Sequence, residues 1–303
     1  MFNQITIFKL ASEMPSIHDI EEKLASAQFV PVGPTQDRSV GFMPPREEHG
    51  AMVESVNGQH IIKVAIETKS VPASVLNEKT DQACKQIEEQ TGRKPGKKER
   101  RDIKDEVLLS LLPAAFPKRS NITVWINPSK RLVLIGSASA IKVDAVAYML
   151  IAELGIRLQM LNTTTSPQAA MTQWLLAESP DDWPDNLNIE RECLLKSIGE
   201  DAASVRFTRH NLANEEVRKH VMEGKLPTAL ALNWDGRVTF VMTDGLQLKK
   251  VQFLDGVMDG GDEYEDRFDA DVALSTGMLE PLLDDVIYAL GGELEHKSEE
   301  PSK

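Results

Sequence analysis

A charged helical stretch over residues 73–113 constrains the fold more than any other part of the chain. It is broken at residues 91–96 (TGRKPG), and glycine and proline at that spacing predict two antiparallel helices joined by a basic turn. An isolated helical pair with an apolar face must bury that face on another surface. On the second helix, such a face is formed by Ile103, Val107, Leu108, Leu111 and Leu112.

Strand and helix patterns precede this stretch. Residues 2–10 (FNQITIFKL) are rich in β-branched and aromatic side chains and predict a strand, as do residues 61–68. Between them we expect a helix over residues 16–27 with Ser16 as its N-cap. Six glycines and prolines between residues 31 and 45 predict a long loop over residues 30–50.

Further strands and helices follow the charged stretch. The patterns predict a β-hairpin over residues 122–127 and 131–137, a helix at 142–154, a linker at 163–167, a short helix at 171–177 and an acidic loop at 178–185. They then predict a strand at 205–208, a helix at 214–224, strands at 226–234 and 237–243 around Asp235-Gly236, a strand at 246–253 and a helix at 278–290. This order indicates an α+β fold with antiparallel sheets and packed helices.

The two cysteines and the apolar runs predict the cellular compartment of the protein. Cys84 and Cys193 are far apart in the sequence and predict two reduced, buried thiols. No apolar run approaches the length of a membrane helix, and the first residues lack the order of a secretory signal. We therefore expect a cytoplasmic protein with no membrane partner.

The net charge of −13 is unevenly distributed. Residues 253–303 hold fifteen acidic and three basic side chains, a net of −12, which leaves −1 for residues 1–252. Residues 93–101 place six positive charges within nine positions. A segregated basic surface can bind a polyanion even on an acidic protein, because affinity follows the local field. A solvated charged helical face is the other explanation of the same run.

No motif predicts catalysis or metal binding. Residues 92–98 have three residues between their glycines where a phosphate-binding loop needs four, and Lys98 replaces its hydroxyl residue. Residues 255–266 resemble a calcium loop, but Val257 stands at a ligand position. The six histidines are dispersed, without the spacing of metal ligands. We expect no enzyme, no metal and no cofactor.

Three motifs, distributed along the chain, resemble those of the RdgC family of recombination-associated proteins. They are residues 104–116 (KDEVLLSLLPAAF) after the basic turn, residues 229–234 (ALALNW), and residues 267–271 (RFDAD) with the closing residues 289–293 (ALGGE). The likeness covers essentially the whole chain, and its long motifs are specific.

The resemblance implies a ring-shaped homodimer, joined head to head and tail to tail, whose positively lined hole admits duplex DNA. It implies DNA binding with little sequence preference, single-stranded DNA as a further ligand, opposition to the RecA recombinase and association with the nucleoid. Residues 1–74 and 118–165 would form a central α+β region, and 75–117 a protruding helical finger at a dimer contact. Residues 166–292 would form a C-terminal α+β region, before a disordered tail at 293–303.

The resemblance also implies two sets of site residues. Phe116 matches the family's apolar residue that inserts into a pocket of the partner, and Val107, Leu108 and Leu111 fit the same interface. The resemblance predicts a residue with an amide side chain directly after Arg209, and the chain has His210 there instead. The DNA-binding candidates are Lys97, Lys98, Arg100, Arg101, Lys118, Arg119 and Arg209.

Two other functions stay open. A protein-interaction adaptor would use the apolar finger to bind a recombination or replication factor, with DNA binding incidental. An unrecognised enzyme such as a nuclease would assemble its active site from distant residues.

Overall fold

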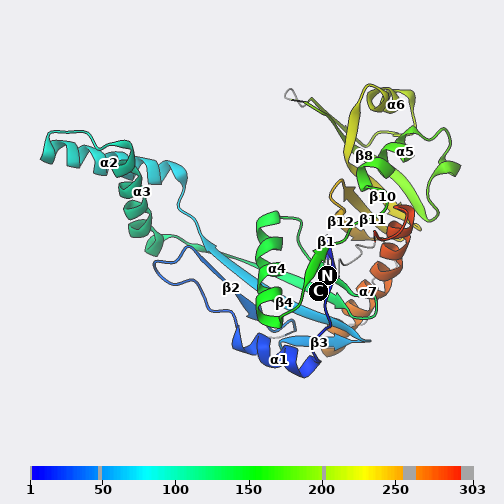
Figure 1. Cartoon of the computed structure of the whole chain (residues 1–303), viewed down its shortest axis with the longest axis horizontal. Helices are drawn as coiled ribbons and strands as arrows, with labels where there is room; N and C mark the ends of the chain where they lie inside the picture. The colour runs from blue at the N-terminus through cyan, green and yellow to red at the C-terminus, as the bar shows by residue number, and fades with distance from the viewer. Residues whose placement is uncertain (1, 47–49, 200–202, 255–263, 295–303) are drawn as a thin grey trace, which may run out of the picture.

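Figure 1 shows the computed structural model, which describes residues 2–46, 50–199, 203–254 and 264–294. The N-terminal strands are β1 (Gln4–Leu10), β2 (Arg38–Met43), β3 (Val53–Val56), β4 (Gln59–Lys69), β5 (Pro117–Asn127), β6 (Leu132–Ile135) and β7 (Leu158–Met160). The C-terminal strands are β8 (Leu187–Ser197), β9 (Ser204–Thr208), β10 (Lys225–Trp234), β11 (Val238–Thr243) and β12 (Gln247–Phe253). All pair antiparallel in one sheet ordered β2-β4-β5-β6-β1-β12-β11-β10-β8-β9, with β3 on β4 and β7 on β1. The α+β class is confirmed, and the expected sheets are joined into one.

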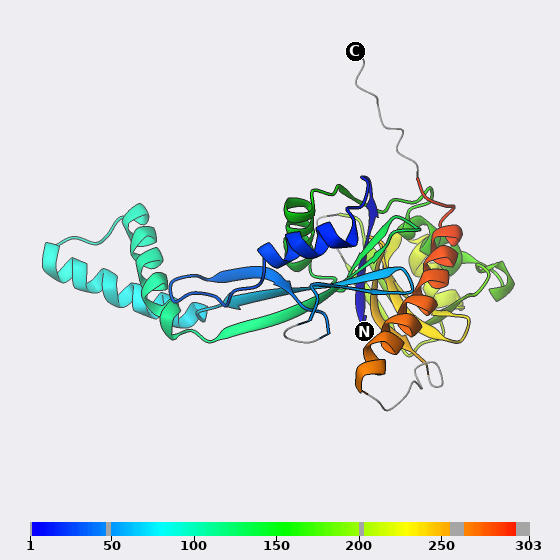
Figure 2. The ribbon, with the colours of Figure 1, turned by 90° about the horizontal axis from the view of Figure 1, so that it is seen from below.

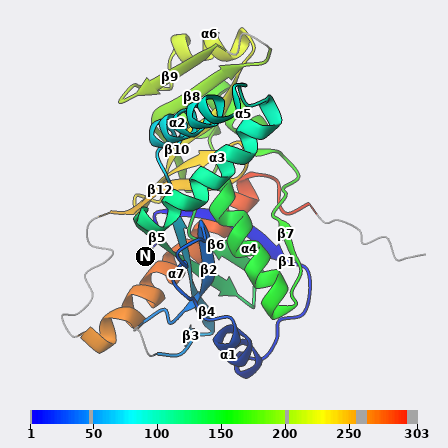
Figure 3. The ribbon, with the colours of Figure 1, turned by 90° about the vertical axis from the view of Figure 1, so that its left-hand side faces the viewer.

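Helices pack on both faces of this sheet. They are α1 (Ile17–Ser26), α2 (Ala73–Thr91), α3 (Lys97–Leu111), α4 (Ala140–Leu154), α5 (Pro167–Leu176), α6 (Glu215–Met222) and α7 (Tyr264–Ala289), with short 3-10 turns at Leu112–Ala114 and Pro180–Asp182. Figure 2 shows α1 and α4 on one side of the N-terminal strands and α7 on the other. One core accordingly holds Leu24 and Val146, and a second holds Trp125 and Leu283. In Figure 3, α1 lies at the opposite side of the molecule from β9 and α6.

The long hairpin of β4 and β5 positions the charged helical pair. Its register runs from His60 opposite Ile126 to Lys69 opposite Pro117. The chain therefore leaves the sheet after β4, forms α2 and α3, and re-enters the sheet directly beside the point where it left. Figure 1 shows both helices at the end of the molecule farthest from α5 and α6.

The predicted loop over residues 30–50 contains an unpredicted strand, β2. The backbone at Phe29 passes beside this strand, and its amide donates to the carbonyl of Phe42 at 2.8 Å. A Cβ atom at Gly41 would lie 2.4 Å from Cα of Phe29. The glycine that indicated a loop instead permits a close approach of two backbone segments.

Two C-terminal elements also differ from the prediction. Strand β8 is absent from the sequence prediction because its alternation is broken where Cys193 and Ile189 pair with Leu230 and Leu232 of β10, which leaves a bulge. Helix α7 begins at Tyr264 instead of residue 278, and Pro281 lies inside it. Proline and the acidic residues before it obscure the helical pattern.

Only the first two residues of the tail expected at 293–303 lie among the described residues. The amide of Leu294 donates to the carbonyl of Asn162 at 2.9 Å, and the carboxylate of Glu293 lies 2.7 Å from Nζ of Lys9. Residues 293 and 294 are therefore held against the sheet, and 295–303 lie outside the described residues.

Several local predictions are confirmed. Ser16 and Asn214 cap α1 and α6 through their side chains. Asp235 and Gly236, both with positive φ, form the turn between β10 and β11. Cys84 and Cys193 are free and buried. These features depend on short sequence signals that the rest of the fold does not override.

We predict that Gly41→Ala lowers the free energy of unfolding by about 1–3 kcal/mol, because the added methyl group collides with backbone that cannot shift independently. The matched control is Gly277→Ala in α7, where a Cβ atom meets nothing within 4 Å, and there we expect a gain of about 0.5–1 kcal/mol. Urea unfolding followed by circular dichroism measures both. Equal midpoints for Gly41→Ala and the wild type would contradict the packing argument.

Candidate nucleic-acid interface

The molecule has two ends that rise on the same side in Figure 1, α2 and α3 at one and the β8–β9 strands at the other, with α4 between them. The basic residues predicted from the sequence fall into three groups along this shape. The groups lie on α3, at the start of β5, and after β9. They do not form one continuous patch.

The first group lies on the N-terminal half of α3. All four predicted cations there are exposed. Arg100 is partly neutralised, because its guanidinium lies 2.6 Å from the carboxylate of Asp81 on α2. For Lys97, Lys98 and Arg101, no carboxylate of the described residues lies within ion-pair distance. These three side chains therefore provide the uncompensated charge of the helical pair.

The second group, at the start of β5, divides into an exposed and a structural cation. Lys118 is exposed, opposite Thr68 of β4. Arg119 donates from Nε to the carboxylate of Glu67 at 2.9 Å, and its guanidinium stands 4.6 Å from the ring centre of Phe29. Its side chain keeps 41% of its surface exposed. Arg119 thus joins β5 to β4 and to the segment beside β2, besides being a candidate for DNA contact.

The partner of Arg119 is a buried carboxylate. Glu67 is only 5% exposed and also accepts a hydrogen bond from the amide of Val32 at 2.9 Å. This backbone hydrogen bond, together with the hydrogen bond and charge of Arg119, holds the pKa of Glu67 below its usual value. The carboxylate is therefore charged at neutral pH and needs its cation.

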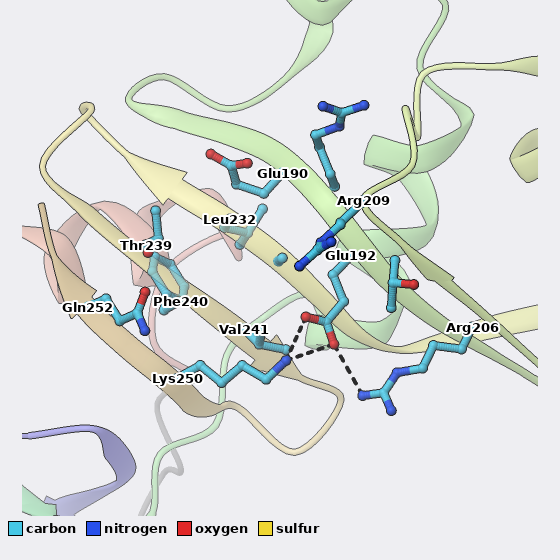
Figure 4. A pocket seen from close by; sticks show the side chains of 13 residues that line it. Glu190, Glu192, Arg206, Arg209, Leu232, Thr239, Phe240, Val241, Lys250 and Gln252 are labelled. Carbon is cyan, nitrogen blue, oxygen red and sulfur yellow. Dashed lines mark hydrogen bonds and ion pairs between the residues drawn. The ribbon is translucent and has the colours of Figure 1, made fainter.

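The third group is centred on Arg209, which follows β9 at the other end of the molecule. Its backbone has a positive φ of 54°, and its side chain is exposed. Arg209 lines an open cavity of about 680 Å³ together with Arg206, Lys250 and Glu192 (Figure 4). These three neighbours were not predicted from the sequence. Arg206 and Lys250 are visible in the sequence only as basic residues within two strands. Strand alternation alone does not distinguish such residues from ordinary solvent-exposed residues of an edge strand.

The predicted dimer-interface residues include the most exposed large apolar side chain that the structure describes. Phe116 is 92% exposed, directly before β5. Val107, Leu108 and Leu111 of α3 are each partly exposed. Leu109, which the sequence analysis did not select, is 52% exposed. Exposed apolar surface of this kind, at and just after the C-terminal end of α3, is typical of a contact with another protein.

The described residues contain neither a metal-binding cluster nor a membrane-spanning helix. Across residues 2–46, 50–199, 203–254 and 264–294, no three histidine, cysteine, aspartate or glutamate side chains gather where they could hold a metal ion. No helix in those ranges is long and apolar enough to cross a membrane. The calcium-like pattern of residues 255–266 falls largely outside the described residues.

We predict that Arg119→Met lowers the free energy of unfolding at pH 7 by about 1–3 kcal/mol, less than for a fully buried pair because Arg119 is partly exposed. Lys118→Met, the matched control on the exposed neighbour, should leave stability unchanged. Because the folded-state pKa of Glu67 is lowered, its charge stabilises the fold at pH values above about 4.3, the pKa of a glutamate in the unfolded chain. This stabilisation is lost as the pH falls through the folded-state pKa. The difference in the free energy of unfolding between Arg119→Met and the wild type should therefore become smaller below about pH 4, as measured by urea titrations. A constant difference down to pH 3 would show that charge pairing is not its cause.

The chain is similar to known proteins over almost its whole length. The family described as "Putative exonuclease, RdgC" matches residues 1–293. "Recombination-associated protein RdgC" of Janthinobacterium sp. (strain Marseille) is 35% identical over 302 residues, covering 98% of this chain and 99% of that protein. The protein of the same name from Herminiimonas arsenicoxydans is 36% identical over 298 residues, covering 96% and 98%. That from Cupriavidus pinatubonensis is 39% identical over 284 residues, covering 92% and 94%.

Proposed function

The chain belongs to the RdgC family, and from this membership and its surface charges we propose that two copies form a ring-shaped dimer that encircles duplex DNA. Binding depends on phosphates and duplex shape with little base readout. In this way the protein occupies DNA that the RecA recombinase would use, and it associates with the nucleoid. Single-stranded DNA is a further ligand of the same surface.

The observation that carries the proposal is the unpaired positive charge at both ends of the molecule. Lys97, Lys98 and Arg101 on α3 lack carboxylate partners among the described residues, and so does Arg209 after β9. The acidic excess of the chain lies elsewhere, in residues 253–303. Cations that have no internal partner are free to replace the counterions of a phosphate backbone.

The helical finger of residues 75–117 supplies one contact between the two copies. Phe116 is nearly fully exposed, and burying an aromatic ring of this size contributes substantially to association. A two-fold contact pairs the same surface on both copies, so each finger would provide both an inserted ring and a receiving surface. Val107, Leu108 and Leu111 form that surface.

The proposal is for a binding protein and not for an enzyme. The family description includes the word exonuclease, whereas the three relatives are named for recombination. No residue of the chain is assigned a catalytic role. Labelled duplex incubated with the purified protein and magnesium should stay intact, and cut product that co-purifies with the protein would overturn this part.

We predict that the logarithm of the DNA association constant falls steeply and linearly with the logarithm of salt concentration. Each phosphate contact contributes about −0.9 to the slope. Replacing Lys97, Lys98 and Arg101 together with alanine should make the slope shallower by about 2.7, on this basis. Lys219→Ala on α6, whose exposed lysine pairs with Glu223, serves as control and should not change the slope. Fluorescence anisotropy on a short duplex measures it, and an unchanged slope in the triple variant would remove α3 from the interface.

We predict that Phe116→Ala opens the ring at the finger contact, which weakens the dimer and abolishes retention on closed circular DNA. Solution mass and dissociation from linear and circular DNA of equal length provide the two readings. Tyr148→Ala on α4, another highly exposed ring, is the matched control and should keep both properties. An adaptor protein would instead lose a protein partner, keep its oligomeric state and release linear and circular DNA equally fast.

A further inference from the structure

Within the part of the chain that the structure describes, helices cover one face of the C-terminal strands β8 to β12 and leave the other face uncovered. Phe207, Leu230 and Phe240 point into the core that α5, α6 and α7 complete. In Figure 1, α5 and α6 lie on the outer side of these strands, so the uncovered face turns toward the side where α2 and α3 stand. The open cavity of about 680 Å³ that contains Arg209 lies on this uncovered face.

Charged side chains of both signs line this face. The cations are Arg191, Arg206, Arg209 and Lys250, and the carboxylates are Glu190 and Glu192. Four positive and two negative charges leave an excess of +2, in a protein whose overall net charge is −13. The face therefore attracts anions, but its carboxylates limit that attraction.

Glu192 is the carboxylate that engages the cations directly. Its two oxygens lie 2.6 and 2.9 Å from Nζ of Lys250, and one of them lies 3.1 Å from a guanidinium nitrogen of Arg206 (Figure 4). Its side chain is 25% exposed, whereas those of Arg206 and Lys250 are 61% and 59% exposed. The hydrogen bond and charge of Lys250, followed by the charge of Arg206, keep the pKa of Glu192 below its usual value. The carboxylate is thus charged at neutral pH and lies beneath two accessible cations.

Irregular backbone brings these groups together. Residues 190–192 lie within the bulge of β8, and the ladder between β11 and β12 is also irregular next to Lys250. Lys250 and Arg209 both adopt positive φ, at 52° and 54°. Bulges redirect side chains, and positive φ is unfavourable for residues other than glycine. The convergence of three strands on Glu192 is therefore a feature of the fold and not of flexible side chains alone.

We propose that this face binds the phosphate backbone of nucleic acid by exchange, in which phosphate oxygens replace Glu192 as the partner of Arg206 and Lys250. The proposal rests on the proposed function and adds three residues to it, together with a reason for weak, mobile binding. Each phosphate that docks here must displace a carboxylate already in place, so affinity is lower and release is faster than the number of cations alone would give. Arg209 has no such internal competitor among the described residues and makes the first contact.

The central test is Glu192→Gln, which keeps the shape of the side chain and removes its charge. Removal of one negative charge next to a bound phosphate should tighten duplex binding about fivefold at low salt, and the log–log salt slope should steepen by about 0.9 for each added phosphate contact. The matched control is Glu22→Gln, because Glu22 is an exposed carboxylate of α1, the helix at the opposite side of the molecule from β9 (Figure 3). This control should stay within about twofold of the wild type. Equal tightening in both variants would show a general charge effect and overturn the exchange.

A double-mutant cycle connects the effect to the two cations. In a background of Arg206→Met and Lys250→Met, the substitution Glu192→Gln should produce no tightening, because the partners that it would release are gone. The two methionine variants on their own test the proposal even if Glu192→Gln fails to fold, and each should make the slope shallower by about 0.9. Unchanged slopes in both would overturn it.

The results also separate this inference from the proposed function. Wild-type protein that binds duplex DNA, loses affinity in the α3 triple variant and does not respond to Glu192→Gln would overturn only the exchange. Wild-type protein that fails to bind duplex DNA even at low salt would overturn the proposed function and the exchange together.

Discussion

The pairing of β4 with β5 is the constraint on which the rest of the molecule depends. Its ladder joins residues nearly fifty positions apart in sequence, Lys69 and Pro117, so the helical pair is inserted into a hairpin instead of being attached by a flexible linker. The same strands form the middle of the two cores, with Trp125 facing one and Val124 the other. The ion pair between Glu67 and Arg119 closes the ladder just before the helices begin. Position and orientation of α2 and α3 follow from this ladder.

The sequence predicted those features that depend on neighbouring residues. The caps at Ser16 and Asn214, the Asp235-Gly236 turn and the break between α2 and α3 are set by local chemistry, and the structure contains each of them. The missed strand β2 depends on a distant contact, since only the approach of Phe29 explains Gly41. The bulge of β8 likewise depends on its partner β10. No local pattern contains that information.

The candidate site shows the same division. Sequence alone identified cations on α3, at the start of β5 and after β9, but could not tell which of them have internal partners. Arg100 and Arg119 are paired with carboxylates from other elements, whereas Lys98 has no carboxylate partner among the residues that the structure describes. Glu192 could not be predicted as a functional residue from the sequence, because its role depends on ion pairs with cations of β9 and β12. Whether a charged side chain is available to a ligand therefore depends on how elements distant in the sequence pack against one another. Composition alone does not reveal this.

The insertion of α2 and α3 into one hairpin has a mechanical consequence. Both ends of the pair continue into adjacent strands, so a pull along the strands draws β4 and β5 together and loads the hydrogen bonds that join them to β2 and β6 simultaneously and in shear. Spreading the two strands apart at the helical pair would instead load the hydrogen bonds between β4 and β5 one after another, beginning at Lys69 and Pro117. A dimer held at the helical pair should therefore resist tension along the strands far better than sideways peeling, which makes the direction of force, as well as its size, decide when the two copies part.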